Sequence, residues 1–477
     1  MNTADSSGQG QNRREPHRPQ TGSAGATRSS GQNGGSASVG AGRADPPGRP
    51  WWRAIGPALI TACVVFGPGS LIINANVGAT YGYQLVWLLV LTGVLMGTYV
   101  SMGARVGVCG GATPCTLLAQ RLGRPMAFLI GLTLCLVCTA FQFSNNLAVA
   151  LAAGAFLPET VSLSPGTDLV LLPVKPMVVV GFNALVILFL FTARQVYQIL
   201  ERAMKILVAV ILICFVVNLL LVRPNVLDVL KGFVPSWPEQ LRFEVPKKIE
   251  GGIEDPMILV ASLLGTTFAV AAAFFQGNMV REKNWTLPDY ENGIVDAIAG
   301  VAVLTCVSMI IMITTATVLP GQKLEDVGQL AQALQPLLGP TAFTLFAMGL
   351  FAVAMNPFVI NAVIGGTILA DGLGLPARMS DRASRLFTVL VMLVGMAVAM
   401  WALVTGNKPV PLMIFGQALT VVGNPLMAAA LLWLANRPDI MGHRRNRWPT
   451  NLLGGVGFLV VLLLAIRVLW RVVLQLS

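Results

Sequence analysis

The chain has 477 residues, of which 55% are hydrophobic and only 11% are charged, whereas soluble domains carry about 25% charged residues. This deficit of charge indicates a membrane protein with many spans. The net charge of +11 lies between apolar runs, and no basic patch with interspersed aromatic residues occurs, so we expect no nucleic-acid binding. No Ser–His–Asp arrangement, phosphate loop or carboxylate pair is visible, so the sequence indicates neither an enzyme nor a cofactor.

Residues 1–50 are rich in Gly, Ser, Gln and Arg and contain no aromatic residue. Such a segment cannot bury an apolar core, so we expect a disordered tail. Its arginines favour a cytoplasmic location under the positive-inside rule. Residues 51–477 are expected to form the transmembrane domain.

Eleven apolar runs follow the tail, and each approaches the roughly 20 residues that a helix needs to cross the hydrocarbon layer. The expected spans are 54–79, 84–107, 125–156, 174–193, 203–222, 257–281, 293–319, 340–370, 384–405, 409–435 and 451–473. The fold class is therefore an all-α polytopic membrane protein, for which the lipid bilayer is a necessary partner.

The charges of alternate loops predict the orientation. With the N-terminus inside, the inner loops hold most arginines, and the outer loops 157–173, 223–256 and 320–339 hold most acids. This asymmetry agrees with the positive-inside rule, and an odd number of spans then places the C-terminus outside. We expect an integral protein of a bacterial inner membrane. At the inner end of span eight, Asp371 and Arg378 are expected to cap and anchor the helix.

The first span is interrupted in its middle by Gly67-Pro68-Gly69-Ser70. Proline removes a backbone donor, and glycine leaves helical geometry readily. Non-helical backbone at membrane depth is tolerated only within protein or beside a wet cavity. Transporters built from inverted repeats use such breaks as binding sites. Five spans, five spans and one more fit that plan, with span six as the partner of span one.

The segment 56–91, with its break and the following Gly82-Tyr83-Gln84-Leu85-Val86-Trp87, resembles span one of the Nramp family of metal transporters. Gln417 with Pro425 eight residues later, Met441-Gly442, and Asp371-Gly372 at the end of span eight match the same family in order and spacing. The resemblance covers about residues 53–473. It implies a LeuT-like 5+5 inverted-repeat bundle plus an eleventh helix, and secondary transport of a divalent metal.

The resemblance also places the expected substrate site. The family's metal-binding Asp and Asn of the first break fall on Gly67 and Ser70. The family's Met of span six, which selects soft transition metals, falls on Ala269, and its carbonyl-donating residue falls on Thr266. With Gln417 of span ten, these five residues are the expected substrate-binding positions, and no metal ligand is identified among them.

The family's proton route is also substituted. Two carboxylates of span three fall on Gln142 and Asn145, a histidine of span six falls on Gln276, and an Asp of span four falls on Asn183. Amides do not titrate in the physiological range, so they cannot relay protons. We therefore expect no proton coupling of the family's kind.

Three functions remain open for an uncharged site. A hydrated divalent cation, similar to Mg²⁺ or Mn²⁺, could move by alternating access, since magnesium dehydrates reluctantly. The alternatives are a LeuT-fold carrier of a small neutral or zwitterionic solute and a non-transporting membrane sensor. The partner is then a transported ion or small solute. Whether span six is broken also stays open, because Ala269–Ala273 are mostly strong helix formers without proline.

Overall fold

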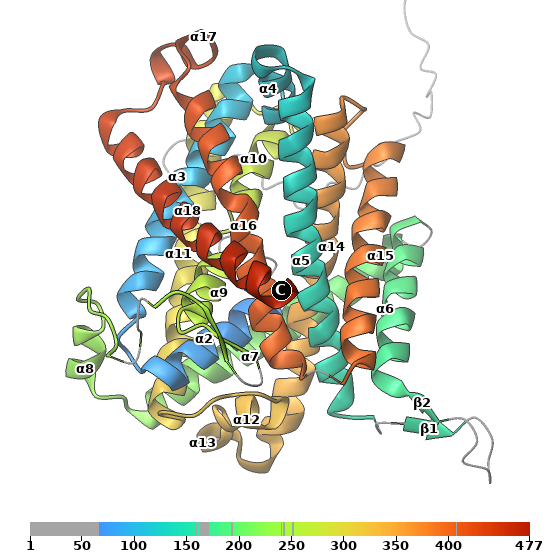
Figure 1. Ribbon diagram of the computed structural model, residues 1–477, viewed down its shortest axis with the longest axis vertical. Helices are drawn as coiled ribbons and strands as arrows, with labels where there is room; N and C mark the ends of the chain where they lie inside the picture. Colours follow the sequence, from blue (N-terminus) through green and yellow to red (C-terminus); the bar gives the residue numbers. More distant parts are fainter. Residues whose placement is uncertain are drawn as a thin grey trace, which may run out of the picture. The chain divides into compact units, whose positions relative to one another are not determined.

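The described part of the chain is a bundle of long helices (Figure 1). In this computed structural model the described residues are 66–157, 160–162, 171–191, 194–239, 241, 244–249, 252–406 and 408–477. The expected tail and the first half of the first span lie outside them. Eight helical segments of the described part are long and apolar enough to cross a membrane, and two shorter apolar segments are at Val174–Leu188 and Ile206–Val222.

The first repeat follows the expected spans. Its long helices are α2 (Pro68–Tyr81), α3 (Val86–Gly110), α5 (Arg124–Gly154), α6 (Val174–Phe191) and α7 (Arg194–Val222). Short elements that the apolar pattern does not predict lie in the joins: α4 (Pro114–Leu122), the antiparallel pair β1 (Thr160–Ser162) and β2 (Leu171–Pro173), and α8 (Val226–Lys231).

The second repeat and the last helix follow a short hairpin of β3 (Lys247–Ile249) and β4 (Gly252–Glu254). Its long helices are α9 (Ile258–Thr267), α10 (Val270–Glu282), α11 (Leu287–Val318), α14 (Ala342–Leu373), α15 (Arg382–Val404) and α16 (Pro409–Asn436), and α18 (Trp448–Leu476) is the eleventh span. The joins add α12 (Val327–Gln332), α13 (Gln335–Leu338) and α17 (Pro438–Met441), with the 3-10 turns Gly339–Thr341 and Gly442–Arg444.

The packing relates the two halves as repeats. In chain order, α2 of the first half corresponds to the broken span α9–α10 of the second, α3 to α11, α5 to α14 and α7 to α16. The pair α3–α10 then has the pair α11–α2 as its counterpart, and the helices of both pairs pack together. The pair α5–α16 likewise becomes α14–α7, and both of these pairs also pack together. This exchange is the relation expected of a transporter built from two structural repeats. The prediction of a LeuT-like inverted-repeat bundle is thereby confirmed.

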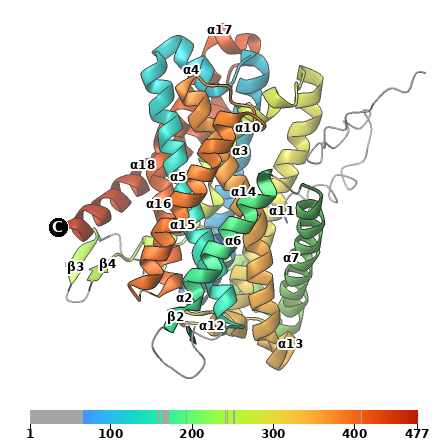
Figure 2. The same ribbon diagram turned by 90° about the vertical axis from the view of Figure 1, so that its right-hand side faces the viewer.

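α18 lies outside the repeats. It packs along α16 and crosses the bundle obliquely in Figure 1, and in Figure 2 it lies on the side opposite α7. Large apolar side chains such as Leu463, Leu386 and Trp401 are more than 65% exposed on α18 and α15. Exposed apolar surface of this kind suits helices that face lipid chains rather than water.

Candidate functional site

The first feature of the candidate site is the start of α2 in the middle of the first span. Gly67 is extended, with φ −106° and ψ 163°, and Pro68 occupies the first helical position, where its fixed φ is favourable. The first intrahelical bond runs from Leu71 N to Gly67 O at 3.2 Å. The N–H groups of Gly69 and Ser70 precede that bond, so they have no acceptor within the helix. The expected break thus coincides with a helix N-terminus.

The sixth span is broken, which answers the question that its sequence left open. The chain leaves helical geometry at Phe268, with φ −100° and ψ 63°, and at Ala269, with φ −78° and ψ 79°. The glycines on either side of the break, Gly265 and Gly277, both lie inside helices. The break therefore does not depend on glycine.

Tertiary contacts hold this break. The Phe268 ring is fully buried and packs edge-on against Tyr99 of α3, with ring centroids 5.2 Å apart. The carbonyl of Phe268 accepts a hydrogen bond from Asn424 Nδ2 of α16 at 3.2 Å. A freed backbone carbonyl at this depth requires such a partner. Asn424 is therefore part of what makes a broken helix possible here.

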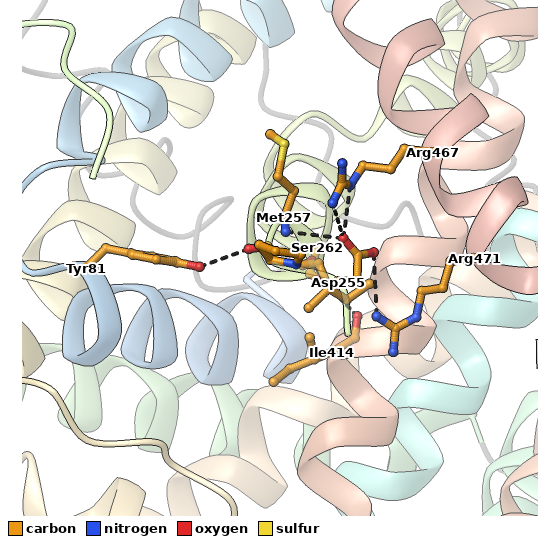
Figure 3. A network of polar contacts seen from close by, with 9 residues as sticks. Tyr81, Asp255, Met257, Ser262, Ile414, Arg467 and Arg471 are labelled. Atoms are coloured by element: carbon orange, nitrogen blue, oxygen red, sulfur yellow. Dashed lines mark hydrogen bonds and ion pairs between the residues drawn. The ribbon is translucent and has the colours of Figure 1, made fainter. Parts of the chain in front are cut away.

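The two breaks lie at the same level of the bundle. α2 packs against α9, and Tyr81 at the end of α2 donates a hydrogen bond to Pro256 O, just before α9, at 3.1 Å (Figure 3). The two helices are therefore antiparallel, which brings the N-terminus of α2 beside the C-terminus of α9. Unpaired N–H groups at one end and unpaired C=O groups at the other carry opposite partial charges.

Gln417 of α16 connects the two breaks. A Cβ on Gly69 would lie 2.6 Å from Gln417 Cδ, so this carboxamide packs directly against the glycine in the first turn of α2. A Cβ on Gly265 of α9 would lie 2.8 Å from Thr420 Oγ1, so α16 also closely approaches α9. Gln417 is 2% exposed, and its Oε1 has no hydrogen-bond partner among the described residues. A buried carbonyl oxygen without a partner is an available acceptor.

The other four expected substrate-binding residues lie at the two breaks. Gly67, Ser70, Thr266 and Ala269 are half-buried, whereas Phe268 between them is completely buried. Thr266 Oγ1 donates to Leu263 O of its own helix at 3.1 Å. The structure thus brings the expected residues of α2, α9 and α16 to one level of the bundle.

The residues expected at the family's proton route lie elsewhere in the bundle. Gln142 of α5 is fully buried against Gly395 of α15, and neither atom of its carboxamide has a partner among the described residues. Asn145 is 2% exposed, and its Nδ2 also lacks a partner in that part. Gln276 is half-buried on α10 and faces α3 near Gly103. No described contact joins these three amides to Gln417.

Asp371 was expected to cap and anchor its own helix, and in the structure it also connects that helix to two others. Its carboxylate accepts hydrogen bonds from Thr113 Oγ1 at 2.8 Å, Thr116 Oγ1 at 3.1 Å and Asn278 Nδ2 at 3.1 Å. These donors lie at α4 and on α10. The carboxylate therefore ties α14 to α4 and α10 at one end of the bundle.

Sequence reasoning missed a buried ion cluster at the opposite end of α9 (Figure 3). Asp255 accepts from Arg467 Nε at 2.9 Å and Nη2 at 2.6 Å, and Arg471 Nη1 lies 3.5 Å from its other oxygen. The Asp255 side chain is 1% exposed. Two arginines within the last apolar run were the available signal, since a charged residue in a span usually has a partner.

Within the described residues, no three His, Cys, Asp or Glu side chains come close enough to hold a metal ion. The polar atoms at the meeting point of α2, α9 and α16 are amide, hydroxyl and backbone groups. Their chemistry suits hydrogen bonding to a neutral ligand or to the water shell of an ion.

Comparison with known proteins gives consistent matches over most of the chain. The family model described as natural resistance-associated macrophage protein-like matches residues 58–471. The divalent metal cation transporter MntH of Deinococcus radiodurans is 26% identical over 427 residues, which cover 87% of this chain and 89% of that protein. MntH of Acidiphilium cryptum is 26% identical over 432 residues, covering 89% and 93%.

Solved structures show the same fold. A mutant of the Eremococcus coleocola manganese transporter superposes with a TM-score of 0.68 at 18% identity, covering 88% of this chain and 87% of that one. Mhp1, a nucleobase-cation-symport-1 family transporter, superposes with a TM-score of 0.50 at 13% identity, covering 88% and 92%.

Proposed function

The chain belongs to the natural resistance-associated macrophage protein (Nramp) family, and from this premise we propose that it is a secondary transporter of a divalent metal cation. The cation crosses by alternating access of the two repeats around a site at the level of the two helix breaks. Relatives named as divalent metal cation transporters support this substrate class.

The observation that carries the proposal is the position of Gln417. Its carboxamide lies beside the first turn of α2, and its buried Oε1 has no partner among the described residues. Its helix also contacts α9 just before the second break. Gly67, Ser70, Thr266 and Ala269 complete the site from α2 and the α9–α10 break. Transporters built from structural repeats bind substrates near the bilayer midplane with such groups, namely free helix ends and acceptor oxygens at one level of the bundle.

The chemistry of these groups favours a hydrated ion. A bare divalent cation would lose most of its hydration energy in a site without a carboxylate, which is a large free-energy cost. A magnesium-like ion keeps several waters when it binds. Amide, hydroxyl and backbone carbonyl oxygens accept hydrogen bonds from those waters, so the ion is held through its hydration shell.

Transport proceeds without the family's proton coupling. Gln142, Asn145 and Gln276 occupy the former proton route, and a carboxamide neither gains nor loses a proton near neutral pH. The membrane potential and the cation gradient then supply the driving force, because a divalent ion carries charge across the bilayer.

The proposed location is a bacterial inner membrane, with the N-terminus in the cytoplasm and the C-terminus outside. The bacterial relatives support this membrane, and the excess of arginine in alternate loops supports this orientation. Labelling of a Ser477→Cys variant with a membrane-impermeant thiol reagent, added to one side of sealed vesicles, tests the placement of the C-terminus. We expect labelling from the outer side, and labelling from the inner side would contradict this placement.

Flux measurement in proteoliposomes tests the function. We expect uptake of Mg²⁺ or Mn²⁺ by the full chain and a strong reduction in Gln417→Leu, which keeps the side-chain volume but removes the carboxamide. Uptake of a labelled neutral amino acid without metal uptake would instead identify a solute carrier. Uptake of neither the metals nor the amino acid would favour a non-transporting sensor. Either of these two results would contradict the proposal.

A further inference from the structure

A polar pocket lies at one end of the bundle, away from the two helix breaks. Its volume is about 460 Å³, and it lies between the end of α16 and the start of α18. His443, Arg445 and Arg447 line it with basic groups, and Asn436, Asn446 and Asn451 line it with amides. No carboxylate belongs to the lining within the described residues.

The amides form a fixed floor. Asn436 Nδ2 donates to Asn451 Oδ1 at 2.8 Å, and Asn451 Nδ2 donates to Asn436 Oδ1 at 2.8 Å. Asn446, which is 6% exposed, donates from Nδ2 to Asn451 Oδ1 at 2.9 Å and from its backbone N–H to Ala435 O at 3.0 Å. Arg105 of α3 donates to Asn446 Oδ1. A network satisfied in this way holds the pocket in one shape.

The positive charge above this floor is not neutralised. Asp439, the acid nearest to the pocket along the chain, pairs with Arg121 at 2.8 Å, and Glu291 pairs with Arg444 at 2.8 Å. In the described ranges Arg445 and Arg447 make no ion pair, and both side chains are exposed at the rim. The N-terminus of the 29-residue α18 adds a partial positive charge at the same place. The pocket is therefore suited to an anion.

The position of the pocket favours a phosphate. Trp448 also lines it, is 75% exposed and is the first residue of the spanning helix α18. Tryptophan at the end of a span lies at the level of the lipid headgroups. Guanidinium groups bind phosphate through paired hydrogen bonds, and basic pockets between spanning helices bind anionic headgroups.

We propose that the pocket formed by His443, Arg445, Arg447 and the three asparagines binds a phosphate group, from an anionic phospholipid headgroup or from a free phosphate anion. The ligand bridges the end of α16 to the start of α18. It fixes the eleventh helix against the second repeat without taking part in the substrate site.

Binding to the purified full chain tests the proposal. The probes are short-chain phosphatidylglycerol, zwitterionic phosphatidylcholine of the same chain length, and sodium phosphate, each titrated with a calorimeter in a neutral detergent. The pocket variant is Arg445→Gln with Arg447→Gln. The matched control is Arg382→Gln with Arg385→Gln, two exposed arginines at the start of α15 that remove the same charge outside the pocket.

We expect phosphatidylglycerol to bind more tightly than phosphatidylcholine, and the pocket variant to weaken that binding roughly tenfold or more, as the loss of two cations near a headgroup implies. The control pair keeps the wild-type affinity, and Arg445→Lys with Arg447→Lys retains most of it. The same pattern with sodium phosphate alone would identify the free anion as the ligand. Equal losses in both Gln pairs, or no loss in the pocket variant, would overturn the proposal.

Discussion

Gly67 at the start of α2 faces Pro357 of α14, and a Cβ on Gly67 would lie 3.6 Å from Pro357 Cγ, an ordinary van der Waals distance. The backbone there is extended, with φ −106°, so a larger residue is accommodated without strain. Neither packing nor backbone geometry therefore requires a glycine at position 67. An aspartate at this N-cap position would also accept a hydrogen bond from the first turn of α2.

Metal affinity can be restored at this position. We expect Gly67→Asp with Ala269→Met to create Mn²⁺ binding, because a carboxylate and a thioether supply the charge and the soft donor that the native site lacks. Calorimetric titration of the purified variant measures this gain. Gly67→Asn with Ala269→Leu has similar side-chain sizes without the charge or the sulfur, and it gains nothing. No gain in the first variant, or an equal gain in both, would show that these positions do not face the ion.

The contact between Gly69 and Gln417 predicts a steric effect. Gly69→Ala places a methyl group into the Gln417 carboxamide and destabilises the fold by about 1–3 kcal/mol, the usual cost of overpacking. Gln417→Ala in the same chain relieves the clash. Gly97→Ala on α3 is the control, because a Cβ there meets nothing within 4 Å. Thermal unfolding in detergent measures all three, and a Gly69→Ala protein as stable as Gly97→Ala would refute the close approach.

The ion cluster of Asp255 predicts a large loss of stability. Asp255→Asn leaves Arg467 and Arg471 buried without a counter-charge, and breaking a buried pair costs about 3–5 kcal/mol. Lys231→Gln is the control, because it removes an ion pair with Asp228 in which both side chains are exposed, at 76% and 43%. Exposed pairs contribute about 0–1 kcal/mol. Similar unfolding temperatures for the two variants would contradict the burial of this cluster.

A surface ion pair predicts a pH dependence. Lys408, by its hydrogen bond and its charge, lowers the pKa of Glu325 below the usual 4.5, and Glu325 raises the pKa of Lys408 above 10.5. The stability from Glu325 is thus present above 4.5 and lost as the pH falls through its lowered pKa. The stability from Lys408 is present below 10.5 and lost as the pH rises through its raised pKa.

Glu325→Gln tests this linkage. The unfolding temperature of the variant lies below that of the wild type at neutral pH, and the difference disappears on acidification through the lowered pKa of Glu325. Thermal scans at a series of pH values measure it. A difference that stays constant down to strongly acidic pH would exclude the pair as its cause.

The long helices could be predicted from the sequence because lipid imposes a simple requirement on them. Every span needs a continuous apolar run, so each long helix from α3 onward overlaps an expected range, although α7 and α11 begin several residues earlier than expected. Short elements such as α4 and α17 lie in the joins, where no such requirement acts.

The break in span six could not be located in the same way. Locally, Ala269 to Ala273 favour helix, and the break is imposed by the burial of Phe268 and by the hydrogen bond from Asn424, more than 150 residues away along the chain. The approach of Gln417 to Gly69 also depends on the packing of distant helices. Asp255 lies within the expected outer loop 223–256, and nothing near it in the sequence indicates its arginine partners on α18.

Simultaneous measurement of divalent cation uptake and internal pH in proteoliposomes tests the account most directly. With an uncharged site and amides in place of titrating groups, Mg²⁺ or Mn²⁺ enters while the internal pH stays constant, and Gln417→Leu strongly reduces the entry. Acidification of the interior in step with metal uptake would mean that protons cross with the metal, and it would contradict the account.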